Sequence, residues 1–290
     1  MNSFSEKYIK YYFIVPVVTY IFIVALFPLL FSIYMSFSKW APGYGLSFIG
    51  ITNFKYIFTD NRFYNSAILT FIYVFSLIFL EFIIGTFLAY LLHKNIKGKN
   101  IFRVLFMLPM LLSPVAVSYV WKMILDSNIG PANYFLSMIG IAPIEWLSGN
   151  YTSVISLIIV DVWQWTPFMT LTILAAFESL PKDLFEAALV DGSSNFSIFT
   201  KIMFPLCLPI IITITLLRTI DAFKVFDTVY ILTGGGPGTS TEILNFYIYL
   251  KGFRNFDLGY GTAMSWIQLI VIIILFMYVT KLLKGSGALR

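Results

Sequence analysis

Long apolar runs that are almost free of charge constrain this chain more than any other feature of its sequence. A helix needs about 20 apolar residues to cross the hydrocarbon core of a membrane. Charged residues make up only 11% of the 290 residues, whereas a soluble domain carries roughly 25%. Six windows qualify as spans: residues 12–37, 64–92, 105–120, 153–177, 203–222 and 262–280. We therefore expect an all-α membrane protein with six transmembrane helices in a single domain over residues 1–290.

The first window raises the alternative of a cleaved signal peptide. The apolar core of a signal peptide is only about 7–15 residues long, and a small-residue cleavage site follows it. The window at 12–37 is longer, and no such site follows it. We expect this segment to be retained as a membrane span.

Basic residues predict the orientation, because cytoplasmic loops carry an excess of Lys and Arg. With a cytoplasmic N-terminus, eleven basic residues fall inside and six outside. The inside set is Lys7, Lys10, Lys94, Lys97, Lys99, Arg103, Lys182, Lys201, Lys281, Lys284 and Arg290, and the outside set is Lys39, Lys55, Arg62, Lys122, Lys251 and Arg254. The sequence thus predicts a multi-pass protein of the cell membrane with both termini in the cytoplasm.

The predicted inner loop at 178–204 has the pattern of two short helices joined by a turn. Pro181 can occupy the first turn of a helix, and the residues that follow have a helix-forming composition. Gly192 can end that helix, because glycine tolerates the positive φ of a C-terminal cap. Ser193 or Ser194 can then cap a second helix.

The first of these two helices has one apolar face. Its members are Leu184, Phe185, Ala188 and Leu189. Such a face alone is typical of an amphipathic helix that lies on a membrane surface, which is the simpler interpretation. The second helix runs into the fifth window, where Pro205 and Pro209 are expected to interrupt its start.

A spaced motif in the same loop favours a more specific interpretation. Glu186-Ala187-Ala188 is followed after three residues by Gly192 and after nine more by Ile202, and Phe204-Pro205 completes the pattern. This pattern resembles the EAA signature of ABC importer permeases, which has leucine where Phe204 stands. The resemblance implies that the loop docks on an ATP-hydrolysing subunit. The implied coupling residues are Glu186, Ala187, Ala188, Asp191, Gly192, Ile202 and Pro205.

Three further segments resemble the carbohydrate-uptake branch of that family. They are YILTGGGPGTSTE at 230–242, WQWTPF at 163–168 and LPMLLSP at 108–114. The resemblance implies the type I ABC importer permease fold, with five core spans and an extra N-terminal span. It also implies as partners a second permease, two ATP-binding subunits and an extracytoplasmic sugar-binding protein. ATP and magnesium would bind to the partners, with no cofactor in this chain, and Gly234, Gly235, Gly236 and Pro237 would face the binding protein.

Four charged side chains fall at membrane depth: Glu81, Asp161, Arg218 and Asp221. A charge there costs about 2.5–3.5 kcal/mol on insertion scales and usually faces a cavity or a partner. Arg218 and Asp221 are three residues apart, so a structural ion pair between them is one alternative. Glu81 is more typical of a contact between helices than of a ligand.

Residues 161, 164, 165 and 168 share one stripe of the fourth predicted span. Carboxylates and amides can bind sugar hydroxyls, and aromatic rings can stack on apolar sugar faces; packing against lipid or other helices is the alternative for the tryptophan. The resemblance to maltose-like permeases implies sugar contacts at the matching positions, and Asp221 shares the face of Arg218. We therefore expect a substrate path lined by Met110, Asp161, Gln164, Trp165, Phe168, Arg218, Asp221, Ala222 and Val225.

The sequence disfavours several other activities. It has no G-x-x-x-x-G-K-[ST] loop for ATP phosphates. His93 is the sole histidine and Cys207 the sole cysteine, so we expect no catalytic triad and no metal cluster. The function predicted is that of a permease subunit, not an enzyme, for a di- or oligosaccharide. The alternatives are a permease for glycerol phosphate, an amino acid or a peptide, and an ion-coupled secondary transporter, for which inverted repeats would be expected.

Overall fold

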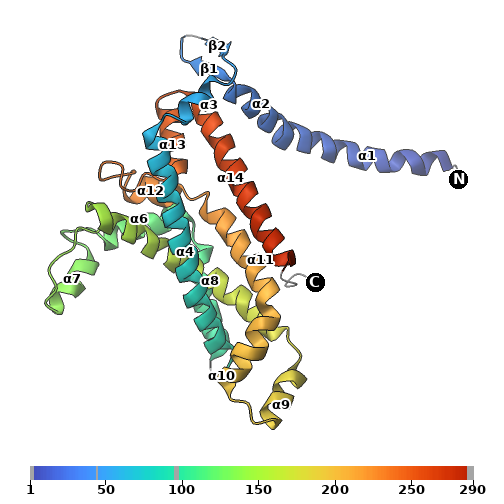
Figure 1. Ribbon diagram of the computed structural model, residues 1–290, viewed down its shortest axis with the longest axis vertical. Coiled ribbons are helices and arrows are strands. Elements are labelled where there is room, and N and C mark those ends of the chain that lie inside the picture. Colours follow the sequence, from blue (N-terminus) through green and yellow to red (C-terminus); the bar gives the residue numbers. More distant parts are fainter. Residues whose placement is uncertain (1–2, 44, 95–97, 286–290) are drawn as a thin grey trace. The chain divides into compact units, whose positions relative to one another are not determined.

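The computed structural model (Figure 1) describes residues 3–43, 45–94 and 98–285. Lys97 and Arg290, which entered the count of basic residues, lie outside the described residues. The chain divides into two compact units. One is formed by Met1–Asn61 with Tyr247–Val271, and the other by Arg62–Phe246 with Ile272–Arg290.

The first unit begins with a long apolar helical segment. α1 (Ser3–Ile21), the π-helical turn η1 (Phe22–Leu26) and α2 (Phe27–Ser36) follow one another without a break, so the expected first span is confirmed. The segment leads into a short antiparallel pair, β1 (Ser38–Ala41) and β2 (Gly45–Phe48), and then into α3 (Thr52–Ile57). The side chain of Asn53 donates to the Ser36 and Ser38 carbonyls at 2.9 Å and so fixes this turn.

The C-terminal part of the first unit is held by one carboxylate. It contains the end of α13 (Leu244–Tyr249), the π-helical turn η3 (Leu250–Arg254) and the start of α14 (Leu258–Gly285). The hydroxyls of Tyr247 and Tyr260 both donate to Oδ2 of Asp60, each at 2.6 Å. These two bonds tie the residue before α4 to α13 and α14.

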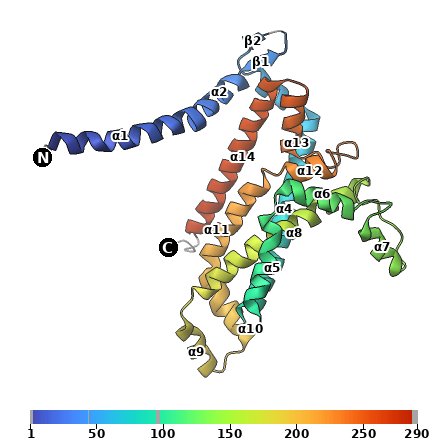
Figure 2. The ribbon, with the colours of Figure 1, turned by 180° about the vertical axis from the view of Figure 1, so that it is seen from behind.

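The second unit is organised around α8. Its helical elements are α4 (Asn61–His93), α5 (Lys99–Leu111), α6 (Pro114–Ile124), α7 (Pro131–Met138), α8 (Asn150–Glu178), α9 (Lys182–Val190), α10 (Asn195–Ile198), η2 (Phe199–Met203), α11 (Phe204–Ala222) and α12 (Asp227–Leu232). α8 packs against both α5 and α11 (Figure 2). Where α4 meets α8, a Cβ on Gly85 would lie 2.8 Å from Met169 Cβ, so glycine permits this close approach.

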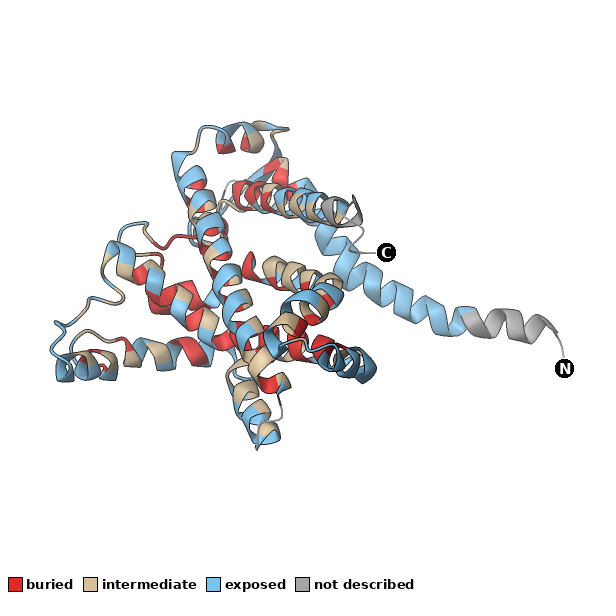
Figure 3. Ribbon diagram, turned by 60° about the horizontal axis from the view of Figure 1, so that its bottom comes forward, coloured by how far each residue is buried: buried red, intermediate tan, exposed pale blue. Residues whose placement is uncertain are grey.

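Buried side chains of the second unit face one another across α4, α8 and α11. One cluster contains Ala89, Leu92, Ile173, Leu174, Ala176, Phe177, Met203, Cys207 and Ile211. In Figure 3, buried residues alternate with exposed ones along the helices of this unit. Phe75, which is 73% exposed, is an example of the large apolar side chains that lipid would solvate.

The structure differs from the prediction in the shape of the third span, which the sequence indicated as one apolar window. It is a bent pair, α5 and α6, with a 95° change of direction at the break between them. Pro114 disfavours helical backbone at the residue before it, and Ser113 is accordingly extended at ψ 141°. The Ser113 hydroxyl then accepts from the Ala116 amide at 3.2 Å and caps α6. The described residues contain five helices long and apolar enough to cross a membrane, or six when the bent pair counts as one span.

Polar side chains stabilise the segment that contains α7, between α6 and α8. The Asn133 amide oxygen accepts from the Ile144 amide at 3.0 Å and from Trp146 Nε1 at 2.9 Å. The Asp126 carboxylate accepts backbone N–H groups, that of Ile129 above all, and these bonds lower the pKa of Asp126. This turn and α7 occupy the segment between the third and fourth predicted spans.

Candidate functional site

A cluster of buried charges joins three helices of the second unit. Arg218 of α11 donates to the Glu81 carboxylate of α4 through Nε at 2.9 Å and through Nη2 at 2.7 Å. The same Nη2 donates to Asp161 of α8. The three side chains are 2%, 0% and 2% exposed. Because removing one member would leave an unpaired charge in a dry site, these contacts fix the three helices relative to one another.

Aromatic side chains complete the environment of this cluster. The Tyr73 hydroxyl donates to Asp161 Oδ2 at 3.3 Å, and the Arg218 guanidinium lies 5.2 Å from the Trp165 ring centroid. A cation at that distance from an indole face is stabilised by the ring quadrupole. Glu81 and Tyr73 were not among the predicted site residues. A charge in the apolar window 64–92 was the signal for Glu81, while nothing in the sequence pointed to Tyr73.

Asp221 does not belong to the cluster. It pairs with Lys224 at 3.0 Å, and both side chains are exposed, at 63% and 66%. The Arg218–Asp221 ion pair considered from the sequence therefore does not form. The buried partners of Arg218 come instead from two other helices, at a distance in sequence that helical spacing does not reveal.

The remaining residues of the predicted substrate path fall into two groups. Gln164 and Ala222 are buried, whereas Met110, Trp165, Phe168 and Val225 are partly exposed. Gln164 Nε2 donates at 3.2 Å to the carbonyl of Leu112, where α5 ends at the bend. The amide thus satisfies a backbone acceptor that the break in the helix leaves without a partner in its own helix.

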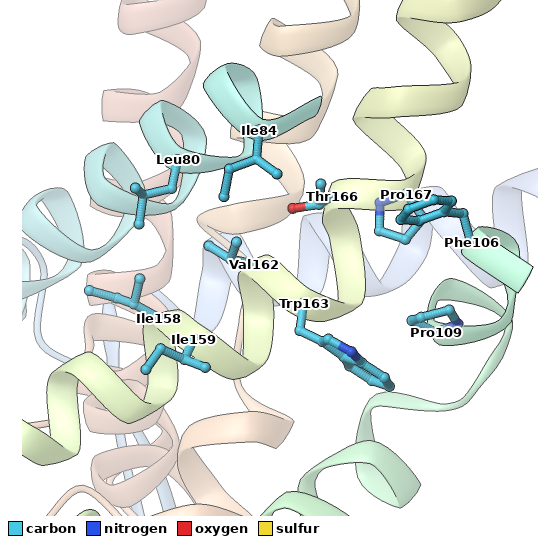
Figure 4. Close-up of a pocket in the computed structure, with 10 residues that line it drawn as sticks. All are labelled: Leu80, Ile84, Phe106, Pro109, Ile158, Ile159, Val162, Trp163, Thr166 and Pro167. Atoms are coloured by element: carbon cyan, nitrogen blue, oxygen red, sulfur yellow. The ribbon is translucent and has the colours of Figure 1, made fainter. Parts of the chain in front are cut away.

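A cavity of about 410 Å³ lies between α4, α5 and α8 (Figure 4). Its lining is almost wholly apolar: Leu80, Ile84, Phe106, Pro109, Ile158, Ile159, Val162, Trp163, Thr166 and Pro167. None of the predicted path residues belongs to it. The stripe formed by 161, 164, 165 and 168 lies on a different face of α8, so this cavity and the predicted path are separate.

The segment 178–204, here called the coupling loop, has the predicted helix–turn–helix form. α9 spans Lys182–Val190, and Gly192 follows with φ +79°. The Ser193 amide donates to the Ala188 carbonyl at 2.9 Å and the Gly192 amide to the Leu189 carbonyl at 3.0 Å, which is the bond pattern of a Schellman cap. The Ser194 hydroxyl accepts from the Ser197 amide at 3.2 Å and caps α10.

Exposure divides the residues of the EAA pattern. Ala188 is buried and Ile202 is partly exposed, whereas Glu186, Ala187, Asp191, Gly192 and Pro205 are exposed. The expected interruption by Pro205 and Pro209 is wrong, because Pro205 lies in the first turn of α11 and Pro209 is accommodated inside it. The irregularity lies earlier, in η2, where the helix widens to a π turn.

The glycine-rich segment 233–240 forms a tight turn closed by threonines. The Thr233 and Thr241 hydroxyls lie 2.7 Å apart, and Thr241 Oγ1 donates to the Gly236 carbonyl at 2.8 Å. Gly234 and Gly235 have φ of +59° and +86°, and a Cβ on Gly235 would meet the Phe246 ring at 2.5 Å. Two of the glycines that were expected to face a binding protein, Gly234 and Gly235, are therefore required by the backbone itself. Gly236 and Pro237 are partly exposed beside them.

The long apolar helices, the bent third span and the coupling loop together define a type I ABC importer permease, a transport subunit and not an enzyme. The chain belongs to the family described as binding-protein-dependent transport system inner membrane component, whose model matches residues 81–285.

Similar proteins agree with this family. The trehalose/maltose transport system permease protein MalF of Thermococcus litoralis is 33% identical over 277 residues, which cover 93% of this chain and 92% of that protein. The probable ABC transporter permease protein y4oQ of Sinorhizobium fredii is 35% identical over 283 residues, covering 96% and 91%. The fold is similar to that of a chain in the crystal structure of a bacterial alginate ABC transporter in complex with its alginate pentasaccharide-bound periplasmic protein. The TM-score is 0.85 at 21% identity, with 97% and 96% of the two chains covered.

Proposed function

We propose that this chain is the permease subunit of an ABC importer that moves a di- or oligosaccharide across the cell membrane. The observation that carries the proposal is the coupling loop, a capped pair of short helices with exposed Glu186 and Asp191, in a chain of an importer family. The similarity to a trehalose/maltose permease and to an alginate transporter supports a sugar as cargo.

The proposed partners are a second permease, two ATP-binding subunits and an extracytoplasmic sugar-binding protein. ATP and magnesium bind to the ATP-binding subunits in this scheme, and this chain contributes no cofactor site. The proposed orientation has both termini in the cytoplasm, so that the coupling loop and the basic side chains near it face the ATP-binding subunits. The glycine-rich turn at 233–240 then faces the binding protein.

Glu186→Lys tests the docking role of the coupling loop. Glu186 is exposed on α9, so the substitution should leave the permease folded but reverse a charge at the proposed ATPase contact. We expect loss of ATPase subunits from the purified complex and loss of uptake. Lys182→Glu is the matched control, a charge reversal at an exposed position of the same helix outside the EAA pattern. Normal assembly and uptake in Glu186→Lys would reject the role.

The cargo is tested by ligand screening of the cognate binding protein followed by uptake in proteoliposomes. We expect a sugar to bind and to be transported only with ATP and with all subunits present. Binding of glycerol phosphate, an amino acid or a peptide, with no sugar bound, would replace the proposed cargo and leave the importer class in place. ATP-independent uptake driven by an ion gradient would overturn the class.

The substrate path is proposed to follow the stripe of α8 that carries residues 161, 164, 165 and 168. Trp165 and Phe168 are partly exposed there, as are Met110 and Val225, so these four side chains can contact a passing sugar. Arg218 pairs with both Asp161 and Glu81, so in this proposal Asp161 and Arg218 hold α8 and α11 in position and do not bind the sugar themselves. The proposal expects Phe168→Ala to lower the uptake rate or alter sugar preference without changing complex yield.

A further inference from the structure

A second cavity, of about 400 Å³, lies between the coupling loop and the end of α4. It is lined by Tyr90, His93 and Lys94 at the end of α4, Phe185 and Leu189 of α9, Asn195 and Ile198 of α10, and Phe199 and Met203 of η2. Cavities of about 300–1,000 Å³ are the size that holds small ligands. None of these residues belongs to the EAA pattern or to the proposed substrate path.

Part of the cavity lining is polar and carries a positive charge. His93 lines it, and Nδ1 of its ring is buried with no hydrogen-bond partner in the described part of the chain. Lys94 is exposed, and its ammonium lies 4.5 Å from the Tyr90 ring centroid. The lining contains no carboxylate, and the nearby Glu178 is paired with Lys99 and Arg103.

The rest of the lining is apolar and packs against the buried core. Met203 is a member of the core cluster, and Tyr90, Phe185 and Phe199 pack against that cluster. The Tyr90 and Phe199 ring centroids are 4.6 Å apart. A ligand that matches both parts of the lining has an anionic, hydrogen-bonding head and an apolar tail.

The position of the cavity selects among such ligands. α4 is long and apolar enough to span a membrane and ends at His93, so the cation and the unpartnered ring nitrogen lie where a span meets lipid headgroups. Basic pockets between helices at this level bind acidic lipid headgroups. We propose that this cavity is a binding site for an anionic phospholipid, with its phosphate at His93 and Lys94 and one acyl chain along Tyr90 and Phe199. Because Phe185 and Leu189 line the site, the lipid contacts α9 directly.

Photo-cross-linking on the assembled transporter tests the site. The complex is placed in nanodiscs of phosphatidylcholine that contain a photoreactive phosphatidylglycerol, and cross-linked peptides are identified by mass spectrometry. We expect cross-links on peptides that contain Tyr90 or Leu189, with competition by unlabelled phosphatidylglycerol. Leu189→Trp fills the cavity and Lys94→Gln removes its cation, so each should cause loss of these cross-links.

Two substitutions serve as matched controls. Val190→Trp places the same bulk on the next residue of α9, which is 88% exposed and does not line the cavity. Lys201→Gln removes an exposed cation of η2 that does not line it either. Both should keep the cross-links. The proposal is overturned if a photoreactive phosphatidylcholine labels the same peptides equally, if Leu189→Trp and Lys94→Gln both label normally, or if excess inorganic phosphate competes, which would indicate a soluble anion.

Discussion

Arg218 and Glu81 form a two-point contact, in which Nε and Nη2 of the guanidinium lie 2.9 and 2.7 Å from the two oxygens of one carboxylate. This geometry fixes the planes of both groups as well as their distance. Since the two residues belong to α11 and α4, the contact also fixes how these two helices are rotated about their axes. Asp161 adds the third helix, α8, through the same guanidinium nitrogen.

Arg218→Met should destabilise the permease severely. The substitution leaves two carboxylates in a dry site without their cation, and breaking a buried ion pair in this way costs about 3–5 kcal/mol. We expect a large loss of complex yield and a lower thermal unfolding temperature in detergent. Neutralising the carboxylates as well, in the triple variant with Glu81→Gln and Asp161→Asn, should restore much of the yield.

Lys224→Met is the control for that experiment. It also removes a cation from an ion pair, here at the end of α11, but Lys224 and Asp221 are exposed, and such pairs contribute about 0–1 kcal/mol. Equal yields of Arg218→Met and Lys224→Met would contradict a stabilising role for the buried cluster.

Gln164→Leu should weaken the bend between α5 and α6. The variant nearly keeps the volume of the side chain but removes the donor of a part-buried hydrogen bond to the Leu112 carbonyl, and such a bond contributes about 0.5–1.5 kcal/mol. Complex yield and uptake measured side by side separate this effect from a substrate contact. Reduced yield with uptake in proportion supports the structural bond, whereas normal yield with slow uptake or altered sugar preference assigns Gln164 to the path.

Gly192→Ala should impair coupling through the backbone alone. No atom lies within 4 Å of a Cβ built on Gly192, so the expected penalty comes from its φ of +79°, about 1–2 kcal/mol for a residue with a side chain. Asparagine tolerates this conformation better, so Gly192→Asn should retain more uptake per ATP hydrolysed than Gly192→Ala.

Gly140→Ala provides the comparison for that variant. Gly140 has φ +77° and equally open surroundings, but it lies outside the coupling loop. Its substitution should lower stability by a similar amount and leave the ratio of uptake to ATP hydrolysis unchanged. A similar fall in that ratio for both alanine variants would show that coupling does not depend on the Gly192 turn.

The turn that precedes α7 should depend on pH. The bonds from the Ile129 and Asn128 amides lower the pKa of Asp126 in the folded state. A group whose folded pKa is lowered contributes stability above its unfolded pKa and loses that contribution as pH falls through the folded pKa. The protection of these amides against hydrogen exchange, measured relative to the intrinsic exchange rate at each pH, should therefore fall on acidification. Asp126→Asn should remove that dependence, and an unchanged pH profile in the variant would contradict it.

The coupling loop was predictable because its signals are local. Pro181, Gly192 and Ser194 act on backbone groups within a few residues, so the sequence located α9, the turn and the cap of α10 at their observed positions. The spacing from Glu186 to Pro205 also indicated the family to which the chain belongs. The break in the third span also has a local signal, because Pro109 and Pro114 flank it. The apolar window was nevertheless interpreted as one continuous span.

The buried charge cluster was not predictable in the same way. Helical spacing offered Asp221 as a partner for Arg218, because the two residues share a face. The actual partners, Glu81 and Asp161, are 137 and 57 residues away in the chain. Their pairing depends on how α4, α8 and α11 pack, and a single sequence carries no direct signal of that packing. Asp221 pairs instead with Lys224, three residues further along the chain, where both side chains are exposed.

The π turn η2 has a consequence for insertions and deletions. Phe199–Met203 lies between the Gly192 turn and α11, within the spacing that links Gly192 to Ile202 and Pro205. A π turn holds one residue more than an α-helical turn, and each residue rotates an α-helix by about 100°. Removing one residue here would convert the wide turn to a regular one without breaking the helix. Because the wide turn already takes up the extra residue, α10 and the turn before it would keep nearly their present direction. A one-residue deletion within the regular helix of α11 would instead rotate the coupling loop and its Glu186 by about 100°, so η2 is the place where this spacer tolerates a change of length.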